Sequence, residues 1–363
     1  GNVMKSLTRT LVLSAAAAGV ALSLGTTAAT AKIYKLTAGS SHPPIVPWVQ
    51  VIKDHVVPQS AALTKAAGKG DSIQWTEAYA GSLYNFKNTL EGVQNGLADI
   101  GWVGTLWEPI KMPLMNVSFY APFVTGDVKV LTNIGQKLHK DVPAMNKAWD
   151  KHNQVYLGIQ VADTYNLFTK FPLKSVADLK GKKLYAPDAL AGWVRGTGAV
   201  AVNGGLPVYY NGVKTGVADG GITITTGMFP FKLHEVGKYV TVVDMGGPIS
   251  GAITMNKDTW NSLPAYMQDI FMKLGAEDSA KQAGIIEKKA GLFLKRMAKQ
   301  GAIVTTLPAA ERRKWAEAMP NIAKERVDAN EKKGLPAKAA MKTFMDAARE
   351  SGAKPLRAWD EGL

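Results

Sequence analysis

Hydrophobic residues follow a strand pattern and then a helix pattern several times along the first half of the chain. Alternating apolar positions predict strands over residues 33–37 and 72–77, with a helix over 48–63 between them. Apolar residues at helical spacing then begin at Phe86 and lead into a strand over 100–103. Because strands and helices alternate in this order, we expect an α/β fold with largely parallel sheets.

The same rhythm continues in the second half. A helix is predicted over 131–151, ahead of the strands of this half. A long helix is predicted from Pro264 to about Gln300, because the first turn of a helix tolerates proline. Two or three further helices are predicted after Leu307, through Ala348. The strands predicted here cover residues 155–161, 167–168, 183–185, 200–202, 221–225, 239–243 and 252–255.

A nine-residue segment occurs twice, 120 residues apart. Residues 93–101 (VQNGLADIG) recur as 213–221 (VKTGVADGG), and each copy is typical of a helix that ends at Gly before an Asp enters a strand. The repeat predicts two similar α/β lobes with a ligand cleft between them; chance similarity is the alternative. We expect residues 32–160 and about 247–300 in one lobe, and 161–246 and about 301–363 in the other. Segments near Val161 and Gly246 would join them.

The N-terminal residues have the pattern of a signal peptide. Lys5 and Arg9 precede an apolar run over 11–24, and small residues end it at Ala31, where we expect cleavage. A transmembrane anchor is the alternative, but the run is short and about half of it is Ala, Gly and Ser. The pattern predicts an exported protein.

The charge distribution and the absence of catalytic motifs argue against a nucleic-acid-binding protein and against an enzyme. The net charge is +14, with much of the excess in Lys-rich C-terminal helices. Few aromatic residues interleave there, which favours a solvated helix face over a nucleic-acid groove. The chain has no cysteine, no G-x-S-x-G elbow and only scattered histidines, so we expect no enzyme, no cofactor and no metal site. An exported hydrolase is the enzymatic alternative.

Four short motifs occur in order between about residues 33 and 276: SVADLKGKKLYAP at 175–187, YNGVKTGVADG at 210–220, KLHEVGKYVT at 232–241 and WNSLP at 260–264. Together they resemble the periplasmic solute-binding subunits of TRAP transporters, a dicarboxylate-binding-protein-like family. The resemblance implies a two-lobed, type II periplasmic binding protein that closes on a small organic anion and passes it to the TRAP membrane permease. We expect a periplasmic monomer, with a dimer as the alternative. A ligand sensor for a membrane receptor would share this fold.

Two positions depart from the family pattern. Members usually carry Arg at the position of Tyr185, and that Arg forks onto the ligand carboxylate. The Asn that usually follows the D-G-x-x segment is replaced by Thr223. Tyrosine supplies one hydroxyl and no charge. We therefore expect a mono-acid with an apolar or aromatic body in place of a dicarboxylate.

One arginine, Arg195, occurs between residues 32 and 295, and it is the candidate partner for a carboxylate. The alternative for Arg195 is a charge on an exposed helix face. Lys87 and Lys170 are further candidates, and backbone N–H groups at Gly81 and Ser82 could also bind an anion.

Aromatic and polar residues gather at strand ends and helix starts, the positions that face the cleft in open α/β sheets. Core packing is the alternative for each aromatic residue, and ordinary strand threonine for Thr223. Trp75, Trp102 and Trp260 lie within elements and are assigned to packing. The predicted ligand contacts are His42, Trp48, Tyr84, Trp107, Asn166, Tyr185, Trp193, Arg195 and Thr223.

Overall fold

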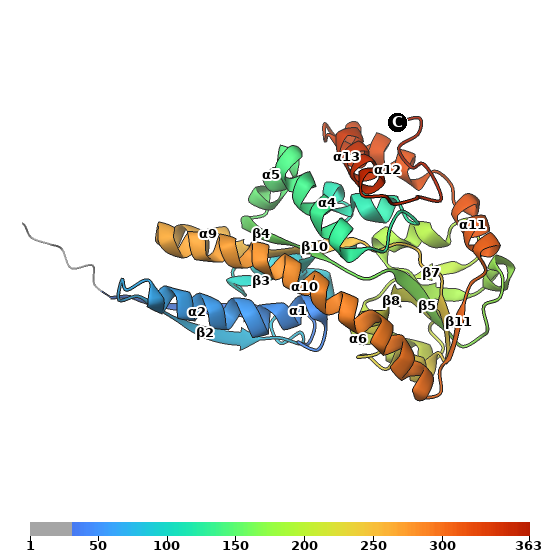
Figure 1. Cartoon of the computed structure of the whole chain (residues 1–363), viewed down its shortest axis with the longest axis horizontal. Coiled ribbons are helices and arrows are strands. Elements are labelled where there is room, and N and C mark those ends of the chain that lie inside the picture. The colour runs from blue at the N-terminus through green and yellow to red at the C-terminus, as the bar shows by residue number, and fades with distance from the viewer. Residues whose placement is uncertain (1–30) are drawn as a thin grey trace, which may run out of the picture.

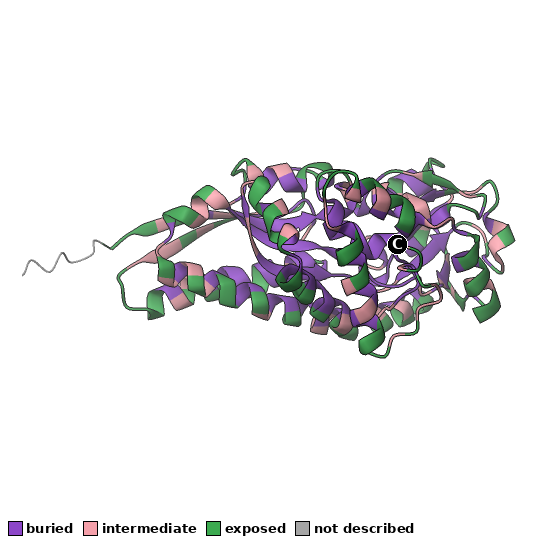
Figure 2. Cartoon of the chain, turned by 90° about the horizontal axis from the view of Figure 1, so that it is seen from above, coloured by how far each residue is buried: buried purple, intermediate pink, exposed green. Residues whose placement is uncertain are grey.

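A computed structural model describes residues 31–363, which form two α/β lobes along one long axis (Figure 1). Nearly all of the predicted signal peptide lies outside the described residues. Among residues 31–363, no helix is long and apolar enough to cross a membrane. Buried residues concentrate on the two sheets, and exposed residues lie on the outer helices and loops (Figure 2).

The first lobe contains a five-stranded mixed sheet. Its order is β2 (Ser72–Ala78), β1 (Ile33–Gly39), β3 (Ile100–Gly104), β10 (Ile249–Asn256) and β4 (Gln154–Val161). The first three strands are parallel, and β10 is antiparallel to both of its neighbours. Strands β3 and β10 are buried along their whole length, as expected where both faces of a sheet are covered.

The second lobe contains a six-stranded mixed sheet in which β5 is the antiparallel strand. The order is β11 (Ile303–Thr306), β9 (Tyr239–Val242), β5 (Tyr165–Thr169), β8 (Gly220–Ile224), β6 (Lys183–Tyr185) and β7 (Val200–Val202). The chain passes between the sheets after β4 and again after β9. The segments near Val161 and Gly246 lie at these two crossings, and a third crossing runs along α10 (Ala265–Lys299), between β10 and β11.

Helices cover both sheets. The long helix α10 (Ala265–Lys299) starts after Pro264, as predicted, and packs along β4 before it reaches α7 in the second lobe. The predicted helix 131–151 is two helices, α4 (Val128–Asp141) and α5 (Pro143–Lys151), because Pro143 disfavours helical backbone at Val142. The other helices and helical turns are α1 (Pro47–Val51), η1 (Ile52–Val56), α2 (Val57–Ala66), η2 (Phe86–Asn88), α3 (Thr89–Gln94), η3 (Thr105–Trp107), η4 (Pro113–Tyr120), α4 (Val128–Asp141), α5 (Pro143–Lys151), η5 (Val176–Leu179), η6 (Asp188–Val194), α6 (Leu206–Lys214), α7 (Thr225–Met228), α8 (Leu233–Val236), α9 (Lys257–Ser262), α11 (Ala309–Ala318), α12 (Ile322–Glu331) and α13 (Ala337–Glu350).

The repeated segment has the same structure in both lobes. Each copy joins a helix, α3 or α6, to the strand that follows it, and its glycine, Gly96 or Gly216, has positive φ. Asp99 Oδ2 accepts the backbone N–H of Thr37 at 2.7 Å, and Asp219 Oδ2 accepts that of Lys183 at 2.8 Å. The two aspartates therefore clamp equivalent neighbouring strands.

The C-terminal helices differ from the predicted lobe assignment of residues 301–363. Helix α11 contacts η5 in the second lobe, but α12 packs on η4, and α13 packs on α4 and η4, which belong to the first lobe (Figure 1). The apolar face of α13, including Met341, Phe344 and Met345, is buried in this contact. The helices thus run back over the first lobe because their apolar faces are covered there.

Candidate functional site

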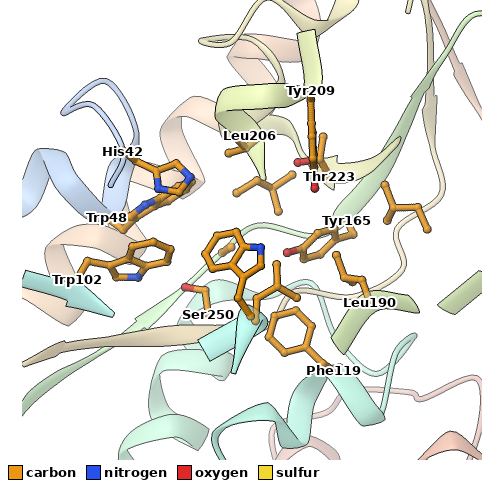
Figure 3. A pocket seen from close by; sticks show the side chains of 15 residues that line it. His42, Trp48, Trp102, Phe119, Tyr165, Leu190, Leu206, Tyr209, Thr223 and Ser250 are labelled. Atoms are coloured by element: carbon orange, nitrogen blue, oxygen red, sulfur yellow. The ribbon is translucent and has the colours of Figure 1, made fainter. Parts of the chain in front are cut away.

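A cavity of about 50 Å³ lies between the lobes (Figure 3). An engineered cavity of about 150 Å³ binds benzene, so we expect the lobes to part or side chains to move when a ligand of that size enters. The first lobe contributes residues from the loop after β1 and from α1, β3, η3, η4 and β10. The second lobe contributes residues from β5, η6, α6 and β8. The lining residues are His42, Trp48, Trp102, Leu106, Trp107, Phe119, Ala162, Tyr165, Leu190, Leu206, Tyr209, Ile222, Thr223, Ile224 and Ser250.

Aromatic rings form the first-lobe wall. The His42 ring lies 5.6 Å from Trp48 and 5.4 Å from Trp102, both edge to face, and Trp102 lies 6.0 Å from Trp107. Gly104 leaves room for this packing, because a Cβ there would lie 2.4 Å from Trp102 and 2.6 Å from Trp107. These contacts hold the rings in fixed positions around the cavity.

The imidazole of His42 is neutral at physiological pH. Burial lowers the pKa of His42 to about 3. Its Nδ1 lies 2.9 Å from the Ser41 hydroxyl, and its ring stacks at 6.0 Å on Trp107. His42 therefore contributes an aromatic face and a neutral polar atom, not a cation.

The second-lobe wall combines aliphatic side chains with two tyrosines, Tyr165 and Tyr209. Tyr209 stacks on Tyr185 at 4.3 Å, and Tyr165 packs edge to face against Trp193 at 5.3 Å. The hydroxyl of Tyr165 points toward the middle of the cavity (Figure 3). Burial raises the pKa values of both Tyr165 and Tyr209, so their hydroxyls keep their protons and can donate hydrogen bonds.

Three buried polar atoms of the lining have no hydrogen-bond partner within the described part of the chain. They are the indole nitrogens of Trp48 and Trp102 and the hydroxyl oxygen of Ser250. Buried polar atoms are rarely left unpaired, because the lost hydrogen bond costs free energy. An acceptor placed in the cavity would satisfy such donors.

None of the fifteen lining residues carries a formal charge at neutral pH. One ionisable residue next to the lining is Asp163, which follows Ala162. Its carboxylate accepts hydrogen bonds from the backbone N–H and the hydroxyl of Thr226, while burial raises its pKa to about 6. The nearby potential is therefore negative once Asp163 is ionised.

A hydrogen bond from the cavity residue Trp107 links the two lobes. Trp107 in η3 donates its indole N–H to the carbonyl of Gly204, which precedes α6, at 2.9 Å. A second cross-lobe bond lies behind it, from Trp193 in η6 to the carbonyl of Phe119 at 2.6 Å. The structure therefore holds the two lobes together around the cavity.

Four of the nine predicted contacts line the cavity: His42, Trp48, Trp107 and Thr223. Tyr185 and Trp193 lie one layer behind it, against Tyr209 and Phe119. The hydroxyl of Tyr185 faces α6, where a Cβ on Gly212 would lie 1.7 Å from it.

Arg195 does not face the cavity, contrary to expectation. Its guanidinium forks onto Glu325 of α12, with N–O distances of 2.6 and 3.1 Å, and the two side chains are 49% and 50% exposed. Arg195 follows the last residue of η6 in extended backbone, which directs it to the surface. Lys87 and Lys170 are also exposed.

Asn166 and Tyr84 do not line the cavity and pack within the protein. The Asn166 side-chain oxygen accepts the N–H groups of Val243 and Asp244, at 2.9 and 3.0 Å, and so ties two of the connections between the lobes together. Tyr84 is buried in the first lobe, where a Cβ on Gly92 would lie 2.3 Å from its ring.

Trp102, which we assigned to packing, lines the cavity, as do Tyr209 and Ser250. Two signals could have indicated this. Trp102 lies two residues before the end of β3, and Ser250 lies near the start of β10, which is antiparallel to β3. The end of one strand and the start of the other meet at the same edge of the sheet.

Comparisons with known proteins match the chain to the same group of bacterial solute-binding proteins. The sequence model of the bacterial extracellular solute-binding proteins of family 7 (DctP) matches residues 65–330. The C4-dicarboxylate-binding periplasmic protein DctP of Rhodobacter capsulatus is 30% identical over 151 residues, which are 41% of this chain and 45% of that protein. The chain spans about half the length of the curated relatives it matches.

Solved structures show the same fold. A TRAP solute-binding protein of Rhodoferax ferrireducens T118, in complex with copurified benzoate, has a TM-score of 0.76 at 19% identity, covering 88% of this chain and 98% of that chain. A TRAP periplasmic solute-binding protein of Sulfitobacter sp. NAS-14.1, with bound β-D-galacturonate, has a TM-score of 0.72 at 20% identity, covering 87% and 100%.

Proposed function

Because the chain belongs to the bacterial extracellular solute-binding proteins of family 7, we propose that it captures a small organic acid in the periplasm and delivers it to a TRAP-type membrane permease. The predicted signal peptide and the four TRAP-type motifs support this role. The cavity between two lobes joined by crossing segments is suited to capture by closure.

The observation that carries the proposal is the uncharged, aromatic lining of the cavity. A mono-acid with an apolar or aromatic body would bury its ring against Trp48, Trp102 and Trp107. Its carboxylate would accept hydrogen bonds from neutral donors. A second carboxylate would have no counter-ion, and an unpaired buried charge costs several kcal/mol. The benzoate complex of the Rhodoferax protein supports this ligand class by analogy of fold.

A ligand screen tests the proposal. Thermal shift of the purified chain, followed by calorimetry, would compare benzoate and phenylacetate with succinate, malate and galacturonate. We expect one site per chain, tighter binding of the aromatic mono-acids, and a smaller radius of gyration with ligand in small-angle scattering. Tight succinate binding without a response to benzoate-type acids would refute the ligand class. Steady consumption of a bound compound would refute the binding role.

Delivery needs a separate test. Uptake into vesicles that contain the cognate permease should depend on this protein and on an ion gradient. Uptake that proceeds equally well without the protein would contradict the proposed partnership.

A further inference from the structure

We infer that the cavity recognises an uncharged hydrogen-bond acceptor on an apolar body and does not select for a negative charge. An amide would then bind about as well as the carboxylate of the same shape. This inference rests on the proposed function, because it concerns the ligand of the same cavity. It changes the substrate class from acids alone to acids and their neutral isosteres.

The first argument is the position of the charges. The Arg195 guanidinium is paired with Glu325 at the surface. Arg312 binds the carbonyl groups of Val243 and Asp244 at the second lobe connection. Neither belongs to the cavity lining, and Asp163 beside the lining is an acid. A ligand anion therefore gains no ion pair with any of the fifteen lining residues.

The second argument is the chemistry of the unpaired atoms. An indole N–H can only donate, so the partner that the Trp48 and Trp102 nitrogens lack is an acceptor, which an oxygen of the ligand could supply. A carboxylate and an amide both supply one.

The third argument concerns the second polar atom of the ligand, which is an oxygen in a carboxylate and the NH₂ group in an amide. Hydroxyls can donate or accept, so those of Ser250, Tyr165 and Thr223 can bond either the second carboxylate oxygen or an amide NH₂. A guanidinium or an ammonium cannot accept a hydrogen bond, and it would leave the amide NH₂ facing a donor. A cavity lined by hydroxyls is therefore compatible with both ligands.

Calorimetry on the full chain at pH 7.5 tests the inference with matched pairs: benzoate and benzamide, phenylacetate and phenylacetamide, pyroglutamate and pyroglutamamide. We expect the two Kd values in the tightest pair to agree within about tenfold. An amide more than about 100-fold weaker than its acid would overturn the inference, because that is the loss expected when a charge-assisted hydrogen bond is removed. The proposed acid-binding function would stand in that case.

Other outcomes separate the two claims. Binding of amides without any acid would support the inference and refute the acid-binding function. A failure of every acid and every amide to bind would overturn both.

Variants locate the donors. Trp48→Phe keeps a ring but removes the N–H, and we expect it to weaken acid and amide alike, by about 5-fold to 30-fold. Ser250→Ala removes an unpaired hydroxyl with little change in packing and provides a second test if Trp48→Phe does not fold. Arg195→Ala is the control for a surface cation and should leave both Kd values unchanged. Unchanged binding in both Trp48→Phe and Ser250→Ala would overturn the assignment of the donors.

Discussion

The hydrogen bond from Trp107 to Gly204 offers a direct test of lobe closure. Trp107→Phe removes the indole N–H but keeps a ring that can pack on Phe86, whose centroid lies 5.3 Å from that of Trp107. A single such bond contributes about 0.5–1.5 kcal/mol net. If the free protein is mostly open, that free energy is lost only from the closed complex, and Kd should rise about 2-fold to 13-fold.

The assay combines calorimetry with small-angle scattering on ligand-free and ligand-bound protein. Trp75→Phe is the matched control, because the Trp75 indole donates to Ser60 at 3.1 Å within the first lobe, away from the cavity. We expect Trp75→Phe to lower the melting temperature without changing Kd. An unchanged Kd and an unchanged radius of gyration in Trp107→Phe would refute the view that this bond holds the lobes together.

Three further predictions concern single residues. Arg195→Ala should leave affinity unchanged and cost at most about 1 kcal/mol of unfolding free energy, since its exposed pair with Glu325 is weak; a tenfold loss of affinity would contradict the surface assignment. Gly212→Ala should destabilise the fold by about 1–3 kcal/mol through the clash with the Tyr185 hydroxyl, and Tyr185→Phe should restore part of that loss in urea unfolding; a neutral Gly212→Ala would contradict the packing. Burial lowers the pKa of His139 to about 4, below its unfolded value near 6.5. The contribution of the neutral His139 side chain to the free energy of unfolding is therefore fully present above pH 6.5 and is lost as the pH falls toward 4. By pH 4 the loss should reach about 3 kcal/mol relative to a His139→Gln variant, and equal pH profiles would refute it.

The two-lobed fold could be predicted because its signals are local. The repeat around Asp99 and Asp219 carries a helix stop and a strand clamp within nine residues, and the structure has both features in each lobe. The C-terminal helices carry no comparable signal. Their apolar faces predict burial, but the sequence does not say which lobe buries them.

The site could be predicted only in part, because side-chain direction depends on contacts far along the chain. The expectation that strand ends and helix starts face the cleft included Trp48, Trp107 and Thr223, and all three line the cavity. Arg195 instead faces Glu325, 130 residues away, on a helix whose position the sequence does not give. Trp102 was missed because the strand pattern indicates two faces without telling which one borders the cleft.

The arrangement of donors explains why closure and recognition should be coupled in this protein. The first lobe holds its indole rings rigidly, through ring contacts around His42 and the space left at Gly104. The second lobe carries the hydroxyl of Thr223 on β8, which begins after the clamp at Asp219. In the proposed mechanism, a ligand that met only the first lobe would reach the indole donors but would leave the hydroxyls of the second lobe in water. When the lobes close, the ligand can also bond the hydroxyls of the second lobe. Differences in ligand shape should therefore change the stability of the closed complex, and with it the affinity.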